Sequence, residues 1–361
     1  MNILYLLNYA GKGGTEKYVR DLVSEYNGSK ANCYFAYNED GLLREQLEDM
    51  GVSCFRLPMK NVLDLRAARL LAKYCKENGI DIIHTQFPRE NVIAVLSKLF
   101  NKKIKVFNTN HLIMTQGAFW KIINKIISPF NEKVFAVCNC GKDVLISNGV
   151  KKEKIEVVFN GIKIAEKNTS TLRNELGIAD NTYVISTLTR YSAEKGLHFL
   201  VDTVDEMKKR NIEDFAFVVA GDGPLYDEIS DKIDSLGLRD NIYQLGYRTD
   251  TQNILCASDL FVNLSSTEAL SFAIIEALSF GIPVVATNVG GTVDIINDKT
   301  ACGVLVEYGD VKSCADEIVK YMCDKDKYET SSQNAFACVK EHFDIQNVFN
   351  KVYDCYEKAI K

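Results

Sequence analysis

Two glutamates, Glu268 and Glu276, flank a run of small and apolar residues that has the pattern of a helix start. A short apolar strand over 259–264 and a turn rich in serine and threonine precede it. A helix start offers backbone N–H groups and the positive end of the helix dipole, which suit phosphate oxygens. A carboxylate beside a diphosphate instead accepts hydrogen bonds from hydroxyls. The pattern indicates a binding site for a nucleotide sugar. The alternative is that the two glutamates have no ligand, one lying on the surface and the other half-buried on the helix.

Two cations, Arg190 and Lys195, follow a strand predicted over 183–189. On a loop at the carboxyl end of a strand, a guanidinium fork and an ammonium can hold a diphosphate together. They would also stabilise the charge that develops on a leaving phosphate. The alternative is a solvated arginine and a lysine paired with Glu194, which would contribute little.

A glycine-rich turn and a histidine mark two further strand ends in the first half of the chain. Gly13 and Gly14 lie between a predicted strand over 3–8 and a predicted helix over 15–26. Glycine lets a loop approach a ligand closely because it has no Cβ, although a tight turn would use the same residues. His111 ends a predicted strand, where it could act on a substrate, or it could be structural.

Length and composition are those of a soluble two-domain protein. The chain has 361 residues, 47% hydrophobic and 25% charged, and lacks an apolar run long enough to span a bilayer. Its N-terminus is typical of a first strand and not of a signal peptide. The 11 cysteines are scattered without metal-site spacing, which suits a reducing cytoplasm. We therefore expect a cytoplasmic protein without a metal.

Charge is unevenly distributed along the chain. Residues 1–165 carry 24 basic and 16 acidic side chains, and the remaining residues carry 19 basic and 32 acidic ones. A basic first half suggests an anionic lipid surface or a phosphate-bearing acceptor, although the asymmetry could arise by chance. Residues 119–127 form a basic amphipathic stretch that could lie on a membrane or pack on the sheet through Ile122, Ile123, Ile126 and Ile127. Nucleic acid is not expected, because no basic block is interleaved with aromatics.

Apolar strands alternate with helical stretches throughout, which predicts an α/β fold with parallel sheets. In the first half the predicted strands are 3–8, 32–37, 53–57, 80–85, 105–110, 133–138 and 155–159. In the second half they are 183–189, 215–220, 242–245, 260–264, 283–286 and 303–306. A polar segment over 163–180 interrupts the rhythm, so we place a domain boundary there. The last residues, 343–360, have the pattern of a helix.

The segment from Glu268 to Ala286 contains Glu, seven residues, Glu-Ala and then Gly-x-Pro-Val-Val-Ala. This pattern resembles the signature region of retaining glycosyltransferases of family four, and the resemblance extends over nearly the whole chain. It implies the GT-B fold, with two Rossmann-like domains whose parallel sheets face across a cleft. The implied domains are an acceptor-side domain over 1–165, a nucleotide-sugar-binding domain over 166–342 and a helix over 343–361 that crosses back.

The resemblance also implies the reaction, which moves a sugar from a nucleoside-diphosphate sugar to an acceptor hydroxyl with retention of anomeric configuration. It assigns the diphosphate to Arg190, Lys195 and the N–H groups near Ser271, Phe272 and Ala273. Glu276 would bind the ribose hydroxyls and Glu268 those of the donor sugar. Gly13 and Gly14 would face the donor diphosphate and the acceptor, and His111 would contact donor or acceptor. No metal is implied, because cations and a helix dipole replace it.

Other functions remain open at the level of sequence. A nucleotide-sugar epimerase of the same fold would need its own acid and base near the sugar. A non-catalytic partner of a transferase would bind a nucleotide sugar without turnover. For a transferase, the basic first half and the amphipathic stretch favour a lipid-linked saccharide of a cell-surface polymer as acceptor, with the protein peripheral on the inner face of the cell membrane.

Overall fold

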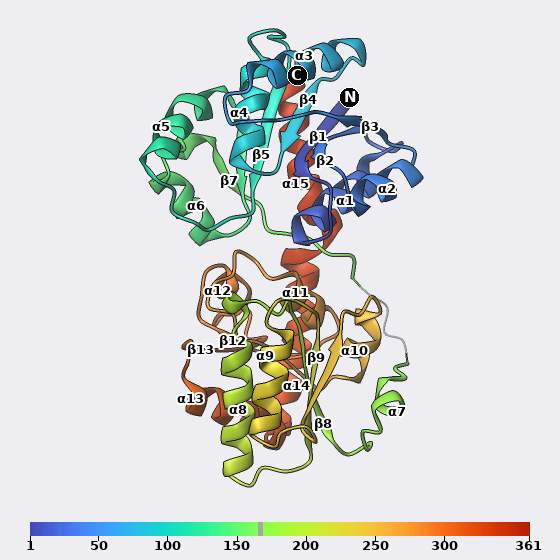
Figure 1. Cartoon of the computed structure of the whole chain (residues 1–361), viewed down its shortest axis with the longest axis vertical. Coiled ribbons are helices and arrows are strands. Elements are labelled where there is room, and N and C mark those ends of the chain that lie inside the picture. Colours follow the sequence, from blue (N-terminus) through green and yellow to red (C-terminus); the bar gives the residue numbers. More distant parts are fainter. Residues whose placement is uncertain (165–168) are drawn as a thin grey trace. The chain divides into compact units, whose positions relative to one another are not determined.

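The chain folds into two compact units, each built on one parallel sheet (Figure 1). The computed structural model describes residues 1–164 and 169–361. The first unit comprises Met1–Gly161 together with Ile345–Lys361, and the second comprises Ile162–Asp344. The boundary expected between residues 165 and 166 lies outside the described residues. The end of the chain belongs to the first unit.

A seven-stranded sheet forms the centre of the first unit, and every neighbouring pair of strands is parallel. In spatial order the strands are β3 (Ser53–Arg56), β2 (Asn32–Glu39), β1 (Asn2–Tyr9), β4 (Ile82–Thr85), β5 (Lys105–Asn110), β6 (Lys133–Ala136) and β7 (Ile155–Val157). The helices of this unit are α1 (Gly14–Tyr26), α2 (Leu42–Asp49), α3 (Leu65–Glu77), α4 (Pro88–Ser97), α5 (Ala118–Ile127), η1 (Ser128–Phe130), α6 (Asn139–Ser147), η2 (Lys152–Lys154) and α15 (Ile345–Ile360).

The second unit contains a six-stranded parallel sheet. Its spatial order is β10 (Ile242–Gly246), β9 (Phe215–Ala220), β8 (Tyr183–Leu188), β11 (Leu260–Asn263), β12 (Val284–Thr287) and β13 (Gly303–Val306). Its helices are α7 (Leu172–Leu176), η3 (Ala193–Lys195), α8 (Leu197–Lys209), α9 (Tyr226–Ser235), α10 (Thr251–Ala257), α11 (Phe272–Ser279), α12 (Thr292–Ile295), α13 (Val311–Cys323), α14 (Lys325–Cys338) and the π-helix η4 (Val339–Phe343). Within the described ranges of the chain, the helices are all too short or too polar to cross a bilayer.

Strand β9 shows why these strands appear in the sequence as continuous apolar runs. Phe215 and Phe217 pack on one face of the sheet with α8, α9 and α13, whereas Ala216 and Val218 pack on the other face with α7 and α10. Successive side chains of a strand point to opposite faces, so a sheet covered by helices on both faces needs apolar residues at every position.

In both sheets the first strand of the unit lies inside the sheet. Strand β1 lies between β2 and β4, and β8 lies between β9 and β11. The chain therefore adds strands first to one side and then to the other. Ligands of such sheets bind beyond the carboxyl ends of the strands at this reversal of direction, which we call the switch point. Each unit thus has one edge where functional residues are expected.

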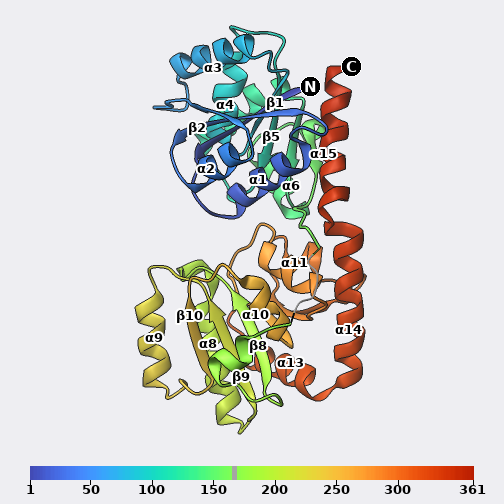
Figure 2. The same ribbon diagram turned by 90° about the vertical axis from the view of Figure 1, so that its right-hand side faces the viewer.

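The last helix, α15, completes the core of the first unit. It packs beside α1, where the Tyr26 hydroxyl donates a hydrogen bond to the backbone oxygen of Phe349 (Figure 2). The Tyr356 hydroxyl lies 2.5 Å from Nδ1 of His84, and Nε2 of the same ring lies 2.8 Å from the Thr109 hydroxyl. His84 is fully buried, and burial together with His111 lowers its pKa to about 3. It therefore connects α15 to the sheet as a neutral ring.

We predict that Phe349→Ala lowers the free energy of unfolding by about 3–5 kcal/mol, because it removes a buried aromatic ring and leaves a cavity. Chemical denaturation followed by circular dichroism would measure the loss. Lys351→Ala, on an exposed position of the same helix, is the matched control and should change stability by less than about 0.5 kcal/mol. Equal stability of the two variants would show that α15 does not contribute to the core.

Candidate functional site

The loops that follow β8 and β11 meet at the switch point of the second unit. The two strands are paired, with Leu260 opposite Ile185. The N–H of Ser266 donates to the backbone oxygen of Glu194 at 2.8 Å. Gly196 has a φ of 66°, and a Cβ at this position would lie 1.9 Å from the Leu264 backbone oxygen. Only glycine allows this close approach, so the loop contact is part of the fold.

Lys195 and Glu268 form an ion pair across these two loops. The Nζ of Lys195 lies 2.6 Å from Oε1 of Glu268, and their side chains are 22% and 10% exposed. The Ser265 hydroxyl donates to the same oxygen at 2.8 Å. The alternative partner considered from the sequence, Glu194, is therefore wrong for Lys195. The loops bring together two residues that are 73 positions apart.

Arg190 pairs with Glu194 instead. Its side chain is 67% exposed, and one guanidinium nitrogen lies 2.7 Å from Oε1 of Glu194. Burial alone would raise the pKa of Glu194, but hydrogen bonds from Ser192 and Arg190 outweigh it and lower the pKa to about 2. Glu194 is thus ionised at neutral pH and holds Arg190 on the loop. Among the described residues, no hydrogen bond or ion pair connects Arg190 directly to Glu268.

The start of α11 follows the same loop. Ser271 caps the helix, and its hydroxyl accepts a hydrogen bond from the N–H of Ile274. Phe272 and Ala273 are the first helical residues, and the half-buried Glu276 lies one turn further on. The N–H groups of a first helical turn have no acceptor within the helix. The three residues predicted for an amide site therefore do lie at a helix start.

Asn263 belongs to the candidate site and was missed by the sequence analysis. It is 5% exposed at the end of β11; its Oδ1 accepts from the N–H of Ser265, and its Nδ2 donates to the Ser271 hydroxyl. Asn263 therefore links the two ends of the loop that carries Glu268. The available signal was a single polar residue within an otherwise apolar strand.

In the first unit, Gly13 and Gly14 lie at the carboxyl end of β1, where α1 begins. Both are exposed. Gly13 has an extended φ of 165°, and an added Cβ would meet only the flexible end of Glu16. The fold itself thus does not require glycine at position 13. The backbone at this edge is exposed, with only the flexible end of Glu16 next to Gly13, so a ligand can approach it.

His111 lies at the same edge, directly after β5. Its Nε2 lies 3.0 Å from Oε1 of Gln86, the residue that follows β4. The ring also makes an edge contact with Tyr18 of α1, with 5.0 Å between centroids. Burial lowers the pKa of His111 to about 3, so the ring is neutral at pH 7. Gln86 was missed because it directly follows two other polar residues, His84 and Thr85, and nothing in the sequence distinguishes it from them.

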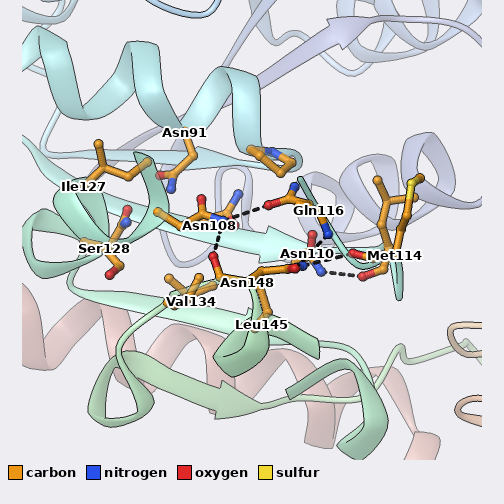
Figure 3. A pocket seen from close by; sticks show the side chains of 15 residues that line it. Asn91, Asn108, Asn110, Met114, Gln116, Ile127, Ser128, Val134, Leu145 and Asn148 are labelled. Atoms are coloured by element: carbon orange, nitrogen blue, oxygen red, sulfur yellow. Dashed lines mark hydrogen bonds between the residues drawn. The ribbon is translucent and has the colours of Figure 1, made fainter. Parts of the chain in front are cut away.

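The segment after His111 is held by side-chain amides (Figure 3). Asn110 donates to the backbone oxygen of Leu112 at 2.6 Å, and Asn148 donates to that of Met114 at 2.9 Å. Asn148 also accepts from the N–H of Gln116 at 2.8 Å. A cavity of about 50 Å³ lies among these amides, which is space for a few water molecules. Within the described part of the chain, no three His, Cys, Asp or Glu side chains are grouped to hold a metal ion.

Comparison with known proteins places these residues in a family. The family model "Glycosyltransferase Family 4" matches residues 12–166, and "Glycosyl transferases group 1" matches residues 168–337. A UDP-Gal:alpha-D-GlcNAc-diphosphoundecaprenol alpha-1,3-galactosyltransferase of Escherichia coli is 26% identical over 88% of this chain and 87% of its own. An N-acetyl-alpha-D-glucosaminyl L-malate synthase of Bacillus anthracis is 25% identical over 82% of this chain and 80% of its own.

The fold also matches a solved structure. Anabaena HepE in complex with UDP is 23% identical and superposes with a TM-score of 0.88, over 99% of this chain and 100% of HepE. Two units with parallel sheets are what the sequence predicted, and this part of the prediction is confirmed. The chain belongs to the glycosyltransferases with the GT-B fold.

Proposed function

We propose that the protein transfers a sugar from a UDP-sugar to an acceptor hydroxyl with retention of the anomeric configuration. The ion pair between Lys195 and Glu268 at the switch point of the second unit carries this proposal. It combines a cation for a diphosphate with a carboxylate for sugar hydroxyls. The E. coli relative is named for a UDP-Gal donor, and HepE was solved with UDP, which supports uridine as the base.

The bonding capacity of the pair suits both parts of such a donor. An ammonium has three N–H donors, and Glu268 uses one of those of Lys195. The others can bind phosphate oxygens together with Arg190 and the N–H groups at Ser271, Phe272 and Ala273. Among the described residues, the hydrogen bonds to the Glu268 carboxylate all go to Oε1. Oε2 can therefore accept a hydrogen bond from a hydroxyl of the donor sugar. Glu276 would accept hydrogen bonds from the ribose hydroxyls.

In the reaction, the acceptor oxygen forms a bond to the anomeric carbon while the bond from that carbon to the diphosphate breaks. The acceptor proton passes to the departing phosphate oxygen on the same face of the sugar. Lys195, Arg190 and the start of α11 stabilise the charge on the leaving group, which is the work of a metal ion in other transferases. The proposal therefore includes no metal and no carboxylate nucleophile. Gly13, Gly14 and His111 would contact the donor sugar and the acceptor.

The exposed side chains of α5 bear on the class of the acceptor. Ile123 and Ile127 are buried in the core of the first unit, whereas Phe119, Ile122 and Ile126 are 56%, 61% and 61% exposed. The sequence alternative in which all four isoleucines pack on the sheet is therefore wrong for two of them. At 100° per residue, the three exposed side chains form one stripe, and Lys121 and Lys125 lie along its side.

Neighbouring segments enlarge this stripe. Leu99 and Phe100 after α4 and Phe130 in η1 are also exposed. The Lys98 ammonium donates to the backbone oxygen of Phe130 at 3.1 Å, so the end of α4 adjoins the end of α5. We call this set the α5 face; its members are Leu99, Phe100, Phe119, Lys121, Ile122, Lys125, Ile126 and Phe130.

Apolar side chains flanked by lysines match a membrane surface with anionic lipids. We therefore infer that the α5 face binds the inner face of the cell membrane from the cytoplasm. The acceptor is then a lipid-linked saccharide, and the relative named for a diphosphoundecaprenol acceptor supports this class.

We predict that Lys195→Ala and Glu276→Ala each weaken UDP binding at least tenfold, because each removes a hydrogen bond to a charged group. Isothermal titration calorimetry would measure the dissociation constants. Lys209→Ala removes an exposed lysine of α8 that pairs with Asp205, and it should leave the affinity unchanged. Wild-type affinity in both site variants would contradict the site.

We predict that the product keeps the donor's anomeric configuration, which proton NMR of the purified product would show through its anomeric coupling constant. Glu268→Gln should lower kcat while UDP affinity changes little, since the carboxylate serves the sugar. Inversion would exclude the proposed chemistry. Epimers formed without acceptor would indicate an epimerase, and donor binding without turnover on any acceptor would indicate a non-catalytic partner.

We predict that the protein co-sediments with phosphatidylglycerol vesicles and much less with phosphatidylcholine vesicles, and that 0.5 M NaCl weakens binding because screening reduces the lysine contribution. The double variants Ile122→Ser/Ile126→Ser and Lys121→Glu/Lys125→Glu should each lose binding. Leu65→Ser/Leu70→Ser, which changes exposed apolar residues of α3, should bind as the wild type does. Equal binding by all three double variants would exclude the α5 face.

A further inference from the structure

Gln86 and His111 are brought together by the pairing of β4 with β5. Thr85 lies opposite Asn108 in this parallel pair, and Gln86 follows β4 as His111 follows β5. Both residues therefore emerge at the carboxyl edge of the first sheet, next to its switch point. The hydrogen bond between His111 Nε2 and Gln86 Oε1, with 3.0 Å between the two atoms, forms at this edge.

The surroundings of the His111 ring leave one polar atom for a ligand. Tyr18 packs edge-on against the ring, and Phe87 lies with its centroid 6.1 Å away. Nε2 is occupied by Gln86. Within the described chain, no hydrogen bond reaches Nδ1. The amides of Asn110 and Asn148 hold the segment that follows His111 (Figure 3), so the backbone next to the ring is fixed.

A glutamine at position 86 lowers the stability of the fold, which a purely structural role would not explain. Its side chain is 0% exposed, and its Nε2 has no hydrogen-bond partner among the described residues. A buried amide nitrogen without a partner destabilises a fold, and a leucine or methionine of similar size would avoid that cost. What glutamine provides and these residues do not is the acceptor oxygen that faces His111.

We propose that Gln86 is a positioning residue that fixes the tautomer of His111. Its Oε1 accepts a hydrogen bond from the N–H at Nε2, so the ring is protonated on Nε2 and Nδ1 is left as a hydrogen-bond acceptor. The tautomer follows from the geometry alone; its use, which is to accept a hydrogen bond from a substrate hydroxyl, rests on the proposed function.

A neutral amide also keeps the ring uncharged. A carboxylate at position 86 would favour the imidazolium form, whereas an amide orients the ring without attracting a second proton. Among the residues that the structure describes, the titratable groups that interact with the ring are Tyr18 of α1, which packs on it, and His84 of β4, which interacts with it electrostatically. Burial raises the pKa of Tyr18 and lowers the pKa of His84 to about 3, so both are neutral at pH 7. His111 therefore acts as a fixed hydrogen-bonding group.

Nitrogen NMR of the full chain labelled with 15N-histidine tests the tautomer without any substrate. The chain has 4 histidines, and the spectrum of His111→Asn identifies the signals of His111. We expect the pattern of a ring protonated on Nε2 alone at pH 7. Gln86→Leu should mix the two tautomers, and Gln86→Glu should raise the pKa of His111 towards its ordinary value of about 6.5.

The control is Asn131→Leu, which removes another buried side-chain amide of the first unit that does not bond to His111. It should leave the His111 signals unchanged, and His198 and His342 are internal references in every spectrum. A wild-type ring protonated on Nδ1, or an unchanged His111 tautomer in Gln86→Leu, would overturn the proposal even if the enzyme transfers sugar as proposed.

Kinetics tests the use of the tautomer separately. Gln86→Leu should lower kcat/KM for the acceptor about tenfold, whereas its dissociation constant for UDP should equal that of the wild type. Gln86→Glu should add an inflection to the pH profile of kcat/KM, since His111 would now titrate in the working range. Unchanged kinetics together with an altered tautomer would refute the role of Nδ1 in the reaction and leave the donor site of the second unit unaffected.

Discussion

The contact between the loops after β8 and β11 is the constraint on which the second unit's site depends. The loops can approach because Gly196 adopts a positive φ against the Leu264 backbone oxygen. That approach places Lys195 within 2.6 Å of Glu268. Removing two charges from water costs free energy, which attraction and added hydrogen bonds must offset, and here Ser265 and the loop backbone supply such bonds. We therefore expect the pair to contribute less to the stability of the fold than to the binding of a ligand.

The two units carry chemically different residues at equivalent edges of their sheets. Each has its first strand inside the sheet, so the candidate site residues of each unit lie at an equivalent edge. In the second unit this edge carries Lys195 and Glu268, two charged groups. In the first unit it carries His111 and Gln86, which are neutral at pH 7. Charged groups suit a diphosphate that leaves, and neutral hydrogen-bonding groups suit hydroxyls that must be oriented.

Much of the fold could be predicted from the sequence, because the periodicity of apolar residues is a local property of the chain. The strands predicted over 105–110, 215–220 and 303–306 have those same bounds as β5, β9 and β13, and the other predicted strands and helices lie within a few residues of those observed. A strand covered on both faces appears as an unbroken apolar run, and a helix start appears as a cap followed by an amphipathic stretch. The sequence also indicated a helix start between Glu268 and Glu276, and α11 begins there, at Phe272.

What the sequence alone determined is therefore which residues lie at strand ends and helix starts. Which of these residues touch each other was decided by the tertiary structure. Lys195 could have paired with Glu194, one position away, yet it pairs with Glu268 because β8 lies beside β11. Gln86 meets His111 because β4 lies beside β5, and Ile122 is exposed because nothing in its unit covers that side of α5. Strand order is a non-local outcome of packing, which local periodicity does not encode.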